Sequence, residues 1–379
     1  MRDRYAGLYL HVPFCARICP YCDFAVRTGG ADKRRKYVDS LLAEMDLYSG
    51  YSETFDTLYF GGGTPSCLES ADLERIVSRV QERLSIADDP WIFLEANPED
   101  VTPERASAWK RVGVRTLSLG VQSFDAEELA FLGRGHTVDQ ARRAVRISRD
   151  TGFHTVSIDL IYGLPDQSTE TWQRRLDDAI ETAPDHLACY QLTIHDGTRF
   201  ALLEKRGELD PLPEAGQASV FRATHEHLSA AGYSGYEVSA FAIEEKHRSR
   251  HNQKYWNHTP YLGLGPSAHS FDGKKRWWNL RRTDPWQEAI ERGDRPLDNA
   301  ETLSSRDLLL ETLMTGMRTY RGIDCDEIKT RFATDLFALN AQLIERLFHA
   351  GLIKRHESRL IPTLDGLAVA DSLAAMFRL

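Results

Sequence analysis

The chain has 379 residues, of which 42% are hydrophobic and 27% are charged, and its formal net charge at pH 7 is −9. This composition fits one large and one smaller globular domain, and it excludes a disordered or fibrous protein. The acidic balance argues against a general nucleic-acid surface, so no nucleic-acid partner is expected.

No apolar run approaches the roughly 18 residues that a membrane span needs, and no signal peptide precedes the first apolar segment. A cytoplasmic protein without a membrane span is therefore expected, with peripheral contact to a membrane left open. Six cysteines are too few and too clustered for a disulfide framework, and in a reducing compartment a tight cluster more often binds metal.

Short apolar or β-branched runs alternate with amphipathic stretches through the first half of the chain, which is typical of βα units and a parallel sheet. Strands are expected at residues 8–11, 57–60, 92–95, 116–120, 156–161 and 187–192. Helices are expected between them, for example at residues 34–47, 70–84, 138–150 and 169–182. The pattern predicts an α/β fold built on a full or partial (β/α) barrel, whose reactive groups come from the C-terminal ends of the strands.

The repeat fades after about residue 195. A connector is expected at 210–213, a helix at 215–231 and a short strand at 236–241. From residue 303, predicted helices at 305–319, 325–332 and 335–350 precede a possible hairpin of residues 351–355 and 359–362, an order that resembles a winged-helix module in fold only. We therefore expect a barrel over 1–210, an extension over 211–302 and a mainly helical C-terminal domain over 303–379.

Cys15, Cys19 and Cys22 form a C-x-x-x-C-x-x-C loop directly after the first predicted strand. Three thiolates can ligate three irons of a 4Fe-4S cluster, which leaves the fourth iron open to a non-protein ligand. S-adenosylmethionine (SAM) is such a ligand in radical SAM proteins, where the reduced cluster cleaves it to a 5′-deoxyadenosyl radical. The alternatives are a zinc site, which lacks a fourth ligand at the usual spacing, or three unrelated buried cysteines.

Further polar or glycine positions recur at the ends of the next strands. The turn at residues 61–65, Gly-Gly-Gly-Thr-Pro, can bring backbone amides close to a ligand, although alone it would be an ordinary glycine turn. Four side chains could supply donors and acceptors for an amine, a ribose and a carboxylate, although singly they would be surface or capping groups. They are Glu95, Gln122, Arg134 and Asp159.

These segments resemble a known family, the radical SAM proteins that include oxygen-independent coproporphyrinogen III oxidase and the HemW heme chaperones. The resemblance covers nearly the whole chain and rests on the motifs at residues 9–15, 19–24, 61–65, 120–123, 132–136 and 159–165. It implies Cys15, Cys19 and Cys22 as cluster ligands and places Tyr21 over the adenine. The SAM contacts that it implies are Tyr9, Gly62, Gly63, Thr64, Glu95, Gln122, Arg134 and Asp159.

Departures from the oxidase favour the chaperone branch. Phe24 stands where the oxidase has a further cysteine, and only eight residues precede Tyr9 where the oxidase has a long N-terminal segment. Residues 251–256, His-Asn-Gln-Lys-Tyr-Trp, match the H-N-x-x-Y-W signature of the HemW chaperones. The resemblance thus implies a protein that binds heme and transfers it to an acceptor protein, for which respiratory proteins are candidates. It also implies that an electron donor such as flavodoxin or ferredoxin serves the cluster.

The signature could serve heme directly. His251 could coordinate the iron, Tyr255 and Trp256 could contact the macrocycle, and the basic residues of 246–250 could pair with propionates. The alternative is that these are buried packing residues beside a solvated loop, and His258 and His269 are rival ligands.

Two functions are compatible with the sequence. One is a heme chaperone without coproporphyrinogen oxidase activity. The other is a radical SAM enzyme acting on a tetrapyrrole, such as the oxidative decarboxylation of coproporphyrinogen III, and a methylase or ring-forming enzyme of the same superfamily is a third reading. Intact SAM-site motifs permit turnover without requiring it.

Overall fold

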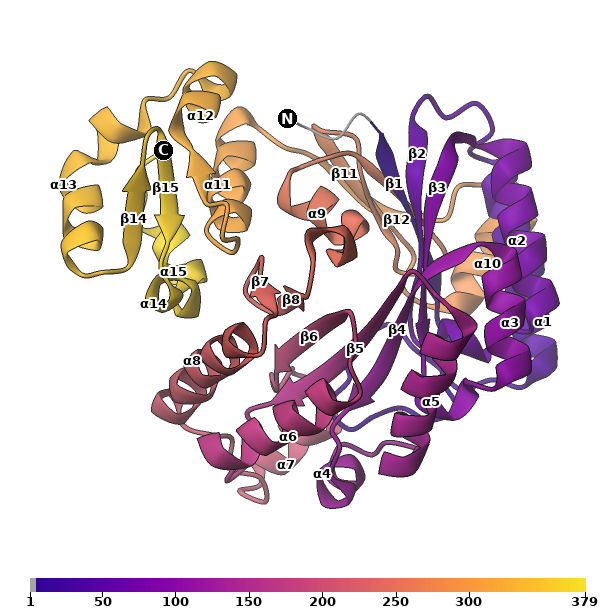
Figure 1. Ribbon diagram of the computed structural model, residues 1–379. Coiled ribbons are helices and arrows are strands. Elements are labelled where there is room, and N and C mark those ends of the chain that lie inside the picture. The colour runs from indigo at the N-terminus through magenta and orange to yellow at the C-terminus, as the bar shows by residue number, and fades with distance from the viewer. Residues whose placement is uncertain (1–4) are drawn as a thin grey trace.

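Six parallel strands form the central part of the molecule in the computed structural model, which describes residues 5–379 (Figure 1). They pair in sequence order, so that each strand lies beside the next one along the chain. This confirms the predicted partial (β/α) barrel. The strands are β1 (Ala6–Val12), β2 (Thr54–Gly62), β3 (Ser85–Ala96), β4 (Val114–Gln122), β5 (Thr155–Tyr162) and β6 (His186–Gln191).

Helices cover the outer face of these strands (Figure 1). Each turns one apolar stripe inward, as in α2, where Leu73, Ile76, Val77 and Val80 are buried at spacings of three and one residues. These side chains join outward-facing strand residues such as Leu10 in one large core. The helices are α1 (Ala31–Asp46), α2 (Ser70–Arg83), α3 (Pro103–Val112), α4 (Ala126–Phe131), α5 (Val138–Thr151) and α6 (Thr169–Glu181), with short 3-10 turns η1 (Pro65–Cys67) and η2 (Pro98–Asp100).

The segment after β6 differs in part from its prediction. The strand expected at residues 236–241 is wrong over 236–239, because the Val238 N–H donates to the Arg318 carbonyl at 3.0 Å instead of extending the sheet. Only β8 (Ala240–Ala242) pairs with β6, antiparallel, and β7 (Ser234–Gly235) follows it at the edge. Around them lie α7 (Arg199–Lys205), α8 (Glu214–Ala230), η3 (Glu245–His247) and α9 (Arg250–Trp256).

Four further strands extend the sheet beyond β1, and the sequence pattern did not predict them. β9 (Tyr261–Leu264) runs parallel to β1, whereas β10 (His269–Phe271), β11 (Lys275–Asn279) and β12 (Leu297–Thr302) continue antiparallel. Helix α10 (Thr283–Glu291) packs against α1. Within the described residues the sheet therefore has twelve strands.

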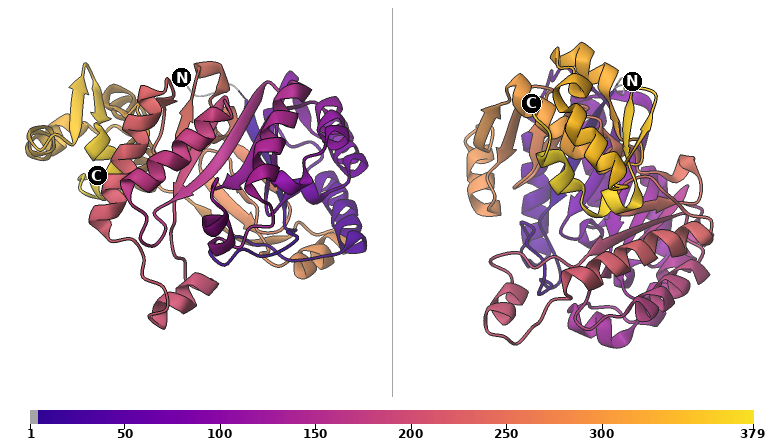
Figure 2. Two further views of the ribbon diagram at one scale, coloured as in Figure 1. Left: turned by 60° about the horizontal axis from the view of Figure 1, so that its bottom comes forward. Right: turned by 90° about the vertical axis from the view of Figure 1, so that its left-hand side faces the viewer.

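The C-terminal segment has a core of its own, which includes Leu313, Leu336, Leu360 and Leu373. The predicted hairpin is present as β14 (Ile353–His356) and β15 (Arg359–Pro362), and β13 (Ile323–Asp324) adds a third strand. The segment stands at one end of the molecule, beside α8 (Figure 2). Its helices are α11 (Ser305–Gly316), α12 (Cys325–Phe332), α13 (Leu336–His349), α14 (Leu364–Ala368) and α15 (Ala370–Ala375).

No helix within residues 5–379 is long and apolar enough to cross a membrane.

Candidate functional site

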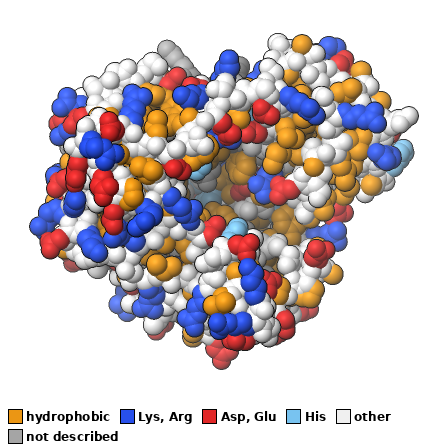
Figure 3. All heavy atoms as spheres, turned by 180° about the vertical axis from the view of Figure 1, so that it is seen from behind, with side chains coloured by type: hydrophobic (Ala, Val, Ile, Leu, Met, Phe, Trp, Pro, Cys, Tyr) orange, Lys and Arg blue, Asp and Glu red, His pale blue; other side chains and the backbone are white. Residues whose placement is uncertain are grey.

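A cavity of about 400 Å³ lies at the C-terminal ends of the parallel strands. This volume is within the usual range for small-molecule and cofactor sites. The strand ends and their following loops supply its walls, as the barrel architecture predicts. Seen from behind, the molecule is hollowed at its centre between the barrel and the C-terminal segment (Figure 3). Eleven of the predicted site residues line the cavity: Cys15, Cys19, Tyr21, Cys22, Gly62, Gly63, Thr64, Glu95, Gln122, Arg134 and Asp159.

The cysteine loop is closed by backbone hydrogen bonds between its two ends. The Cys15 N–H donates to the Arg27 carbonyl at 3.0 Å, and the Arg27 N–H donates to the Pro13 carbonyl at 2.7 Å. Within the loop, the Cys22 N–H donates to the Cys19 carbonyl at 3.1 Å. All three cysteines are free thiols, partly exposed, and line one cavity, so their donor set fits three corners of a 4Fe-4S cluster.

The glycine turn after β2 is fastened to the start of the cysteine loop. The Gly63 and Thr64 N–H groups donate to the Val12 and Phe14 carbonyls, both at 2.8 Å. A side chain at Gly63 would place its Cβ 2.7 Å from the Phe14 carbonyl oxygen, so this close approach requires glycine. The Thr64 hydroxyl lies 3.5 Å from the Cys15 sulfur. The turn and the cluster loop therefore form one wall of the cavity.

Arg134 connects three parts of the cavity. Its Nη2 donates to the Asn97 side-chain oxygen at 2.7 Å and to the Gly120 carbonyl at 2.8 Å. Its Nη1 lies 3.5 Å from the Cys19 sulfur. The guanidinium thus holds the ends of β3 and β4 against the cluster loop and places a positive charge where thiolates and a ligand carboxylate would be stabilised.

Two partly buried carboxyl groups face the cavity, and loss of hydration raises the pKa of each to about 7. Glu95 accepts a hydrogen bond from the Tyr59 hydroxyl at 2.7 Å and one from the Gly62 N–H at 3.2 Å. Asp159 accepts one from the Ser118 hydroxyl at 3.1 Å. Carboxyl groups held this way favour a ligand that brings positive charge or hydroxyl donors, and the SAM ammonium and ribose hydroxyls supply both.

Gln122 has a backbone conformation that non-glycine residues rarely adopt, with φ of +70°. The pairing of β4 with β5 shifts register between Leu119 and Gln122, so the strand end bulges toward the cavity. Gly120 lies under this bulge, and a Cβ there would come within 3.1 Å of the Gln122 amide nitrogen. The bulge turns the Gln122 side chain into the cavity wall.

Tyr9 and His251 do not line the cavity. The Tyr9 hydroxyl lies 3.2 Å from Nδ1 of His11. His251 is 1% exposed, and its two ring nitrogens lie 2.9 Å from the Thr57 hydroxyl and 2.8 Å from the Tyr255 hydroxyl. A neutral imidazole has one donor and one acceptor nitrogen, and both are used here, so the structure does not support iron ligation by His251.

The basic run at residues 246–250, which ends at the first residue of α9, also contacts other parts of the protein. Lys246 pairs with Glu244 at 2.9 Å, and the Arg250 guanidinium lies 4.3 Å from the Trp91 ring centre. His258 is 6% exposed, whereas His269 is exposed and stacks on Trp278.

Several cavity residues were missed by sequence reasoning. Asn97 accepts a hydrogen bond from Arg134 and follows Glu95 by two residues, at the end of β3. It could have been found from the strand-end rule, by which the reactive groups of a barrel lie at or just after the C-terminal ends of its strands. Tyr190 and His195 come from the end of β6 and the loop after it, where the same rule applies. Ile18 and Phe24 also line the cavity, and both are exposed to solvent, by 53% and 63%.

The sequence and structure of this chain are similar to those of known proteins of one class. The family model described as "Radical SAM superfamily" matches residues 9–179, the part that builds most of the cavity, and the model described as "HemN C-terminal domain" matches residues 303–369. The solved structure of Escherichia coli coproporphyrinogen III oxidase (HemN), described as a radical SAM enzyme, has a TM-score of 0.85 at 24% identity, covering 98% of this chain and 90% of that one. The fold and cavity are thus those of a radical SAM protein, a class that implies a 4Fe-4S cluster and SAM.

The curated relatives narrow the class. "Heme chaperone HemW" of Mycobacterium tuberculosis is 33% identical over 97% of this chain and 93% of its own length. The proteins of the same name from Synechocystis and E. coli are 35% and 39% identical, covering 83% and 69% of this chain and 78% and 69% of their own lengths. The chain belongs to the HemW family.

Proposed function

We propose that this protein is a cytoplasmic heme chaperone that binds heme and passes it to an acceptor protein. Respiratory proteins are candidate acceptors. In this proposal Cys15, Cys19 and Cys22 hold a 4Fe-4S cluster, and SAM occupies the adjoining cavity. A donor such as flavodoxin or ferredoxin would supply the electron that the cluster's chemistry requires. Family membership over 97% of the chain supports the proposal.

The observation that carries the choice of chaperone over oxidase is Phe24. The resemblance places a further cysteine of the oxidase at this position, and here a phenylalanine side chain, 63% exposed, stands at the mouth of the cavity. A phenyl ring has no donor or acceptor for substrate chemistry. Together with exposed Ile18 it instead offers apolar contact of the kind that a flat macrocycle needs.

The cavity residues have separable roles in this proposal. When bound, the cluster and SAM supply one-electron chemistry at the open iron. Arg134 balances charge at the cluster loop, while Glu95 and Asp159 bind the ammonium and ribose hydroxyls. Gly63 lets the backbone of its turn approach the cluster loop closely.

An anaerobic experiment separates the chaperone from an enzyme. With the cluster reconstituted, heme binding is measured by absorbance titration, and 5′-deoxyadenosine and carbon dioxide are measured in the presence of coproporphyrinogen III. The proposal predicts saturable heme binding without substrate-coupled decarboxylation. Multiple turnovers on coproporphyrinogen III would instead establish the oxidase.

The cluster ligands are tested separately. Replacing one of three thiolates removes a corner ligand, so Cys19→Ala is expected to abolish the iron-sulfur absorbance and most bound iron and sulfide. Cys189→Ala is the matched control, since that cysteine is buried in the main core, away from the loop. Unchanged iron and sulfide in Cys19→Ala contradict the ligand assignment.

A further inference from the structure

The helix that carries the signature motif, α9, is anchored at the opposite end of the barrel from the cavity. Its Lys254 is 1% exposed, pairs with Asp56 at 2.8 Å and donates to the Tyr5 carbonyl at 2.9 Å. A Cβ at Gly7 would come within 3.0 Å of both the His251 ring and the Lys254 side chain. The helix is therefore packed tightly against the first residues of β1 and β2.

An aromatic layer separates α9 from the cavity. The His251 ring centre lies 5.0 Å from that of Tyr59, 6.3 Å from that of Phe93 and 6.5 Å from that of Tyr9. These rings come from three different strands, β2, β3 and β1, and they meet only inside the barrel. Because the interior is closely packed, the position of the His251 ring limits where the Tyr59 ring can lie.

Tyr59 connects this layer with the cavity. Its hydroxyl donates to one oxygen of Glu95 at 2.7 Å, and the Gly62 N–H donates to the other at 3.2 Å. Gly61 lies directly beside this pair, since a Cβ there would come within 2.8 Å of the Tyr59 ring and 3.2 Å of the Glu95 carboxylate. A continuous set of contacts thus runs from His251 through Tyr59 to a carboxyl group of the cavity.

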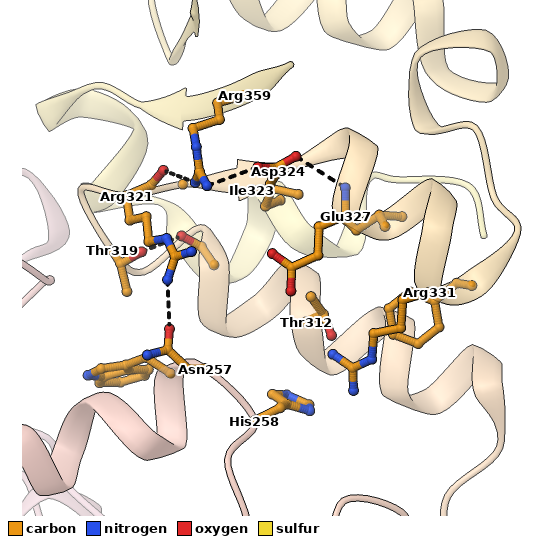
Figure 4. Close-up of a pocket in the computed structure, with 15 residues that line it drawn as sticks. Asn257, His258, Thr312, Thr319, Arg321, Ile323, Asp324, Glu327, Arg331 and Arg359 are labelled. Atoms are coloured by element: carbon orange, nitrogen blue, oxygen red, sulfur yellow. Dashed lines mark hydrogen bonds and ion pairs between the residues drawn. The ribbon is translucent and has the colours of Figure 1, made fainter. Parts of the chain in front are cut away.

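The other end of α9 meets the C-terminal segment. The Arg321 side chain donates to the Asn257 side-chain oxygen at 3.4 Å, and a small cavity lies between these residues, His258 and the C-terminal elements (Figure 4). Glu327, Arg331 and His258 point toward the same space in this view (Figure 4). The signature helix therefore lies between the C-terminal segment and the aromatic layer.

We propose that the signature motif is a positioning element for the SAM site: His251 fixes Tyr59, and Tyr59 holds the Glu95 carboxylate in the orientation that receives the SAM ammonium. His251 and Tyr59 are positioning residues, since neither lines the cavity. The proposal concerns SAM binding and holds whether or not the protein carries heme.

The test measures SAM affinity and heme affinity in the same variants of the reconstituted, anaerobic protein. Tyr59→Phe keeps the ring and removes one hydrogen bond to a charged acceptor, so the Kd for SAM is expected to rise about tenfold or more. His251→Ala is expected to raise it about tenfold, and His251→Asn, which can keep the contact with Thr57, to recover part of the loss. The matched control is His349→Ala, whose exposed side chain lies on α13.

Two readouts distinguish positioning from general damage. Because His251 acts through Tyr59, adding His251→Ala to Tyr59→Phe is expected to weaken SAM binding little further. The change that SAM causes in the electron paramagnetic resonance spectrum of the reduced cluster is expected to shrink in both variants, while iron content and heme affinity stay constant. An unchanged Kd for SAM in Tyr59→Phe and His251→Asn overturns the proposal. So does a His251→Ala variant that loses heme absorbance and keeps its SAM affinity.

Discussion

At the scale of single residues, the cavity contains two kinds of acid. The cysteine thiols must be deprotonated to bind iron, whereas burial raises the pKa of the carboxyl groups and so opposes their ionisation. The pKa values of Glu95 and Asp159 lie near 7, although both groups have hydrogen-bond donors. A carboxylate withdrawn from water without a counter-charge is unfavourable, and among residues 5–379 no cationic side chain is paired with Glu95. The SAM ammonium would provide that charge, which explains why the site leaves these carboxyl groups incompletely paired.

The pH dependence of stability follows from these pKa values. An unfolded glutamate ionises near pH 4.3, whereas Glu95 in the folded protein ionises near 7. Between these values the folded state binds more protons, so the free energy of unfolding falls as pH rises, by up to about 3 kcal/mol for this group. Urea unfolding of the cluster-free protein at pH 5, 6 and 7 should show this decline, and Glu95→Gln should reduce it. An equal decline in the variant contradicts the assignment.

The sequence could predict those site residues that the strand-end rule or a short motif identifies, and the structure brings eleven of them to one cavity. It could not predict the surroundings of His251, because its partners Thr57 and Tyr59 lie about 190 residues earlier in the chain. A histidine in a motif looks the same whether it faces a ligand or a packed interior. Only the fold separates the two cases.

At the scale of elements, local pattern predicted the βα units well and the sheet extension not at all. Strands β1 to β6 alternate with long amphipathic helices, so periodicity identifies each unit. Strands β9 to β12 have three to six residues, and only the connection from β11 to β12 contains a helix, α10. They join the barrel only through the pairing of β9 with β1, which is distant in sequence. Short antiparallel strands of this kind leave little signal in a single sequence.

Helix α5 illustrates how local sequence places a functional loop. A capping box begins the helix, in which the Gln140 N–H donates to the Thr137 hydroxyl at 3.2 Å and the Thr137 N–H donates to the Gln140 side chain at 2.8 Å. Since Arg134 lies three residues before this cap, the cap fixes the end of its loop. Thr137→Ala is expected to cost about 1 kcal/mol of stability. Chemical denaturation measures this, with exposed Thr330→Ala as control; equal stability of both variants contradicts the role of the cap.

At the scale of the whole molecule, two separate cores lie on either side of α9. The larger one supports the barrel and its cavity and includes Leu367 of α14, and the smaller one supports most of the segment after residue 303. The segments contact each other where α14 packs against α8, and through polar links such as the Arg276 guanidinium, which forms two hydrogen bonds with Glu311 at 2.9 and 2.8 Å. Because most of the C-terminal segment packs in the smaller core, we expect it to unfold in a transition of its own.

A single core substitution tests this organisation. Leu360 on β15 is fully buried in the smaller core, so Leu360→Ala is expected to cost about 2–5 kcal/mol through lost burial and a cavity. Scanning calorimetry of the reconstituted protein should show one transition moved to lower temperature. Cluster absorbance and the Kd for SAM should be retained at 25 °C. Loss of the cluster signal together with that transition would show that the two cores unfold as one unit.

The measurement that tests the central claim most directly is the rate at which bound heme moves to an acceptor. The heme-loaded, cluster-containing protein is mixed with an apocytochrome of b type, and in parallel with apomyoglobin as a scavenger of released heme. A chaperone is predicted to deliver heme to the apocytochrome faster than the scavenger captures it, with a rate that rises with acceptor concentration. Equal rates to both proteins, independent of acceptor concentration, would show passive release and contradict the account.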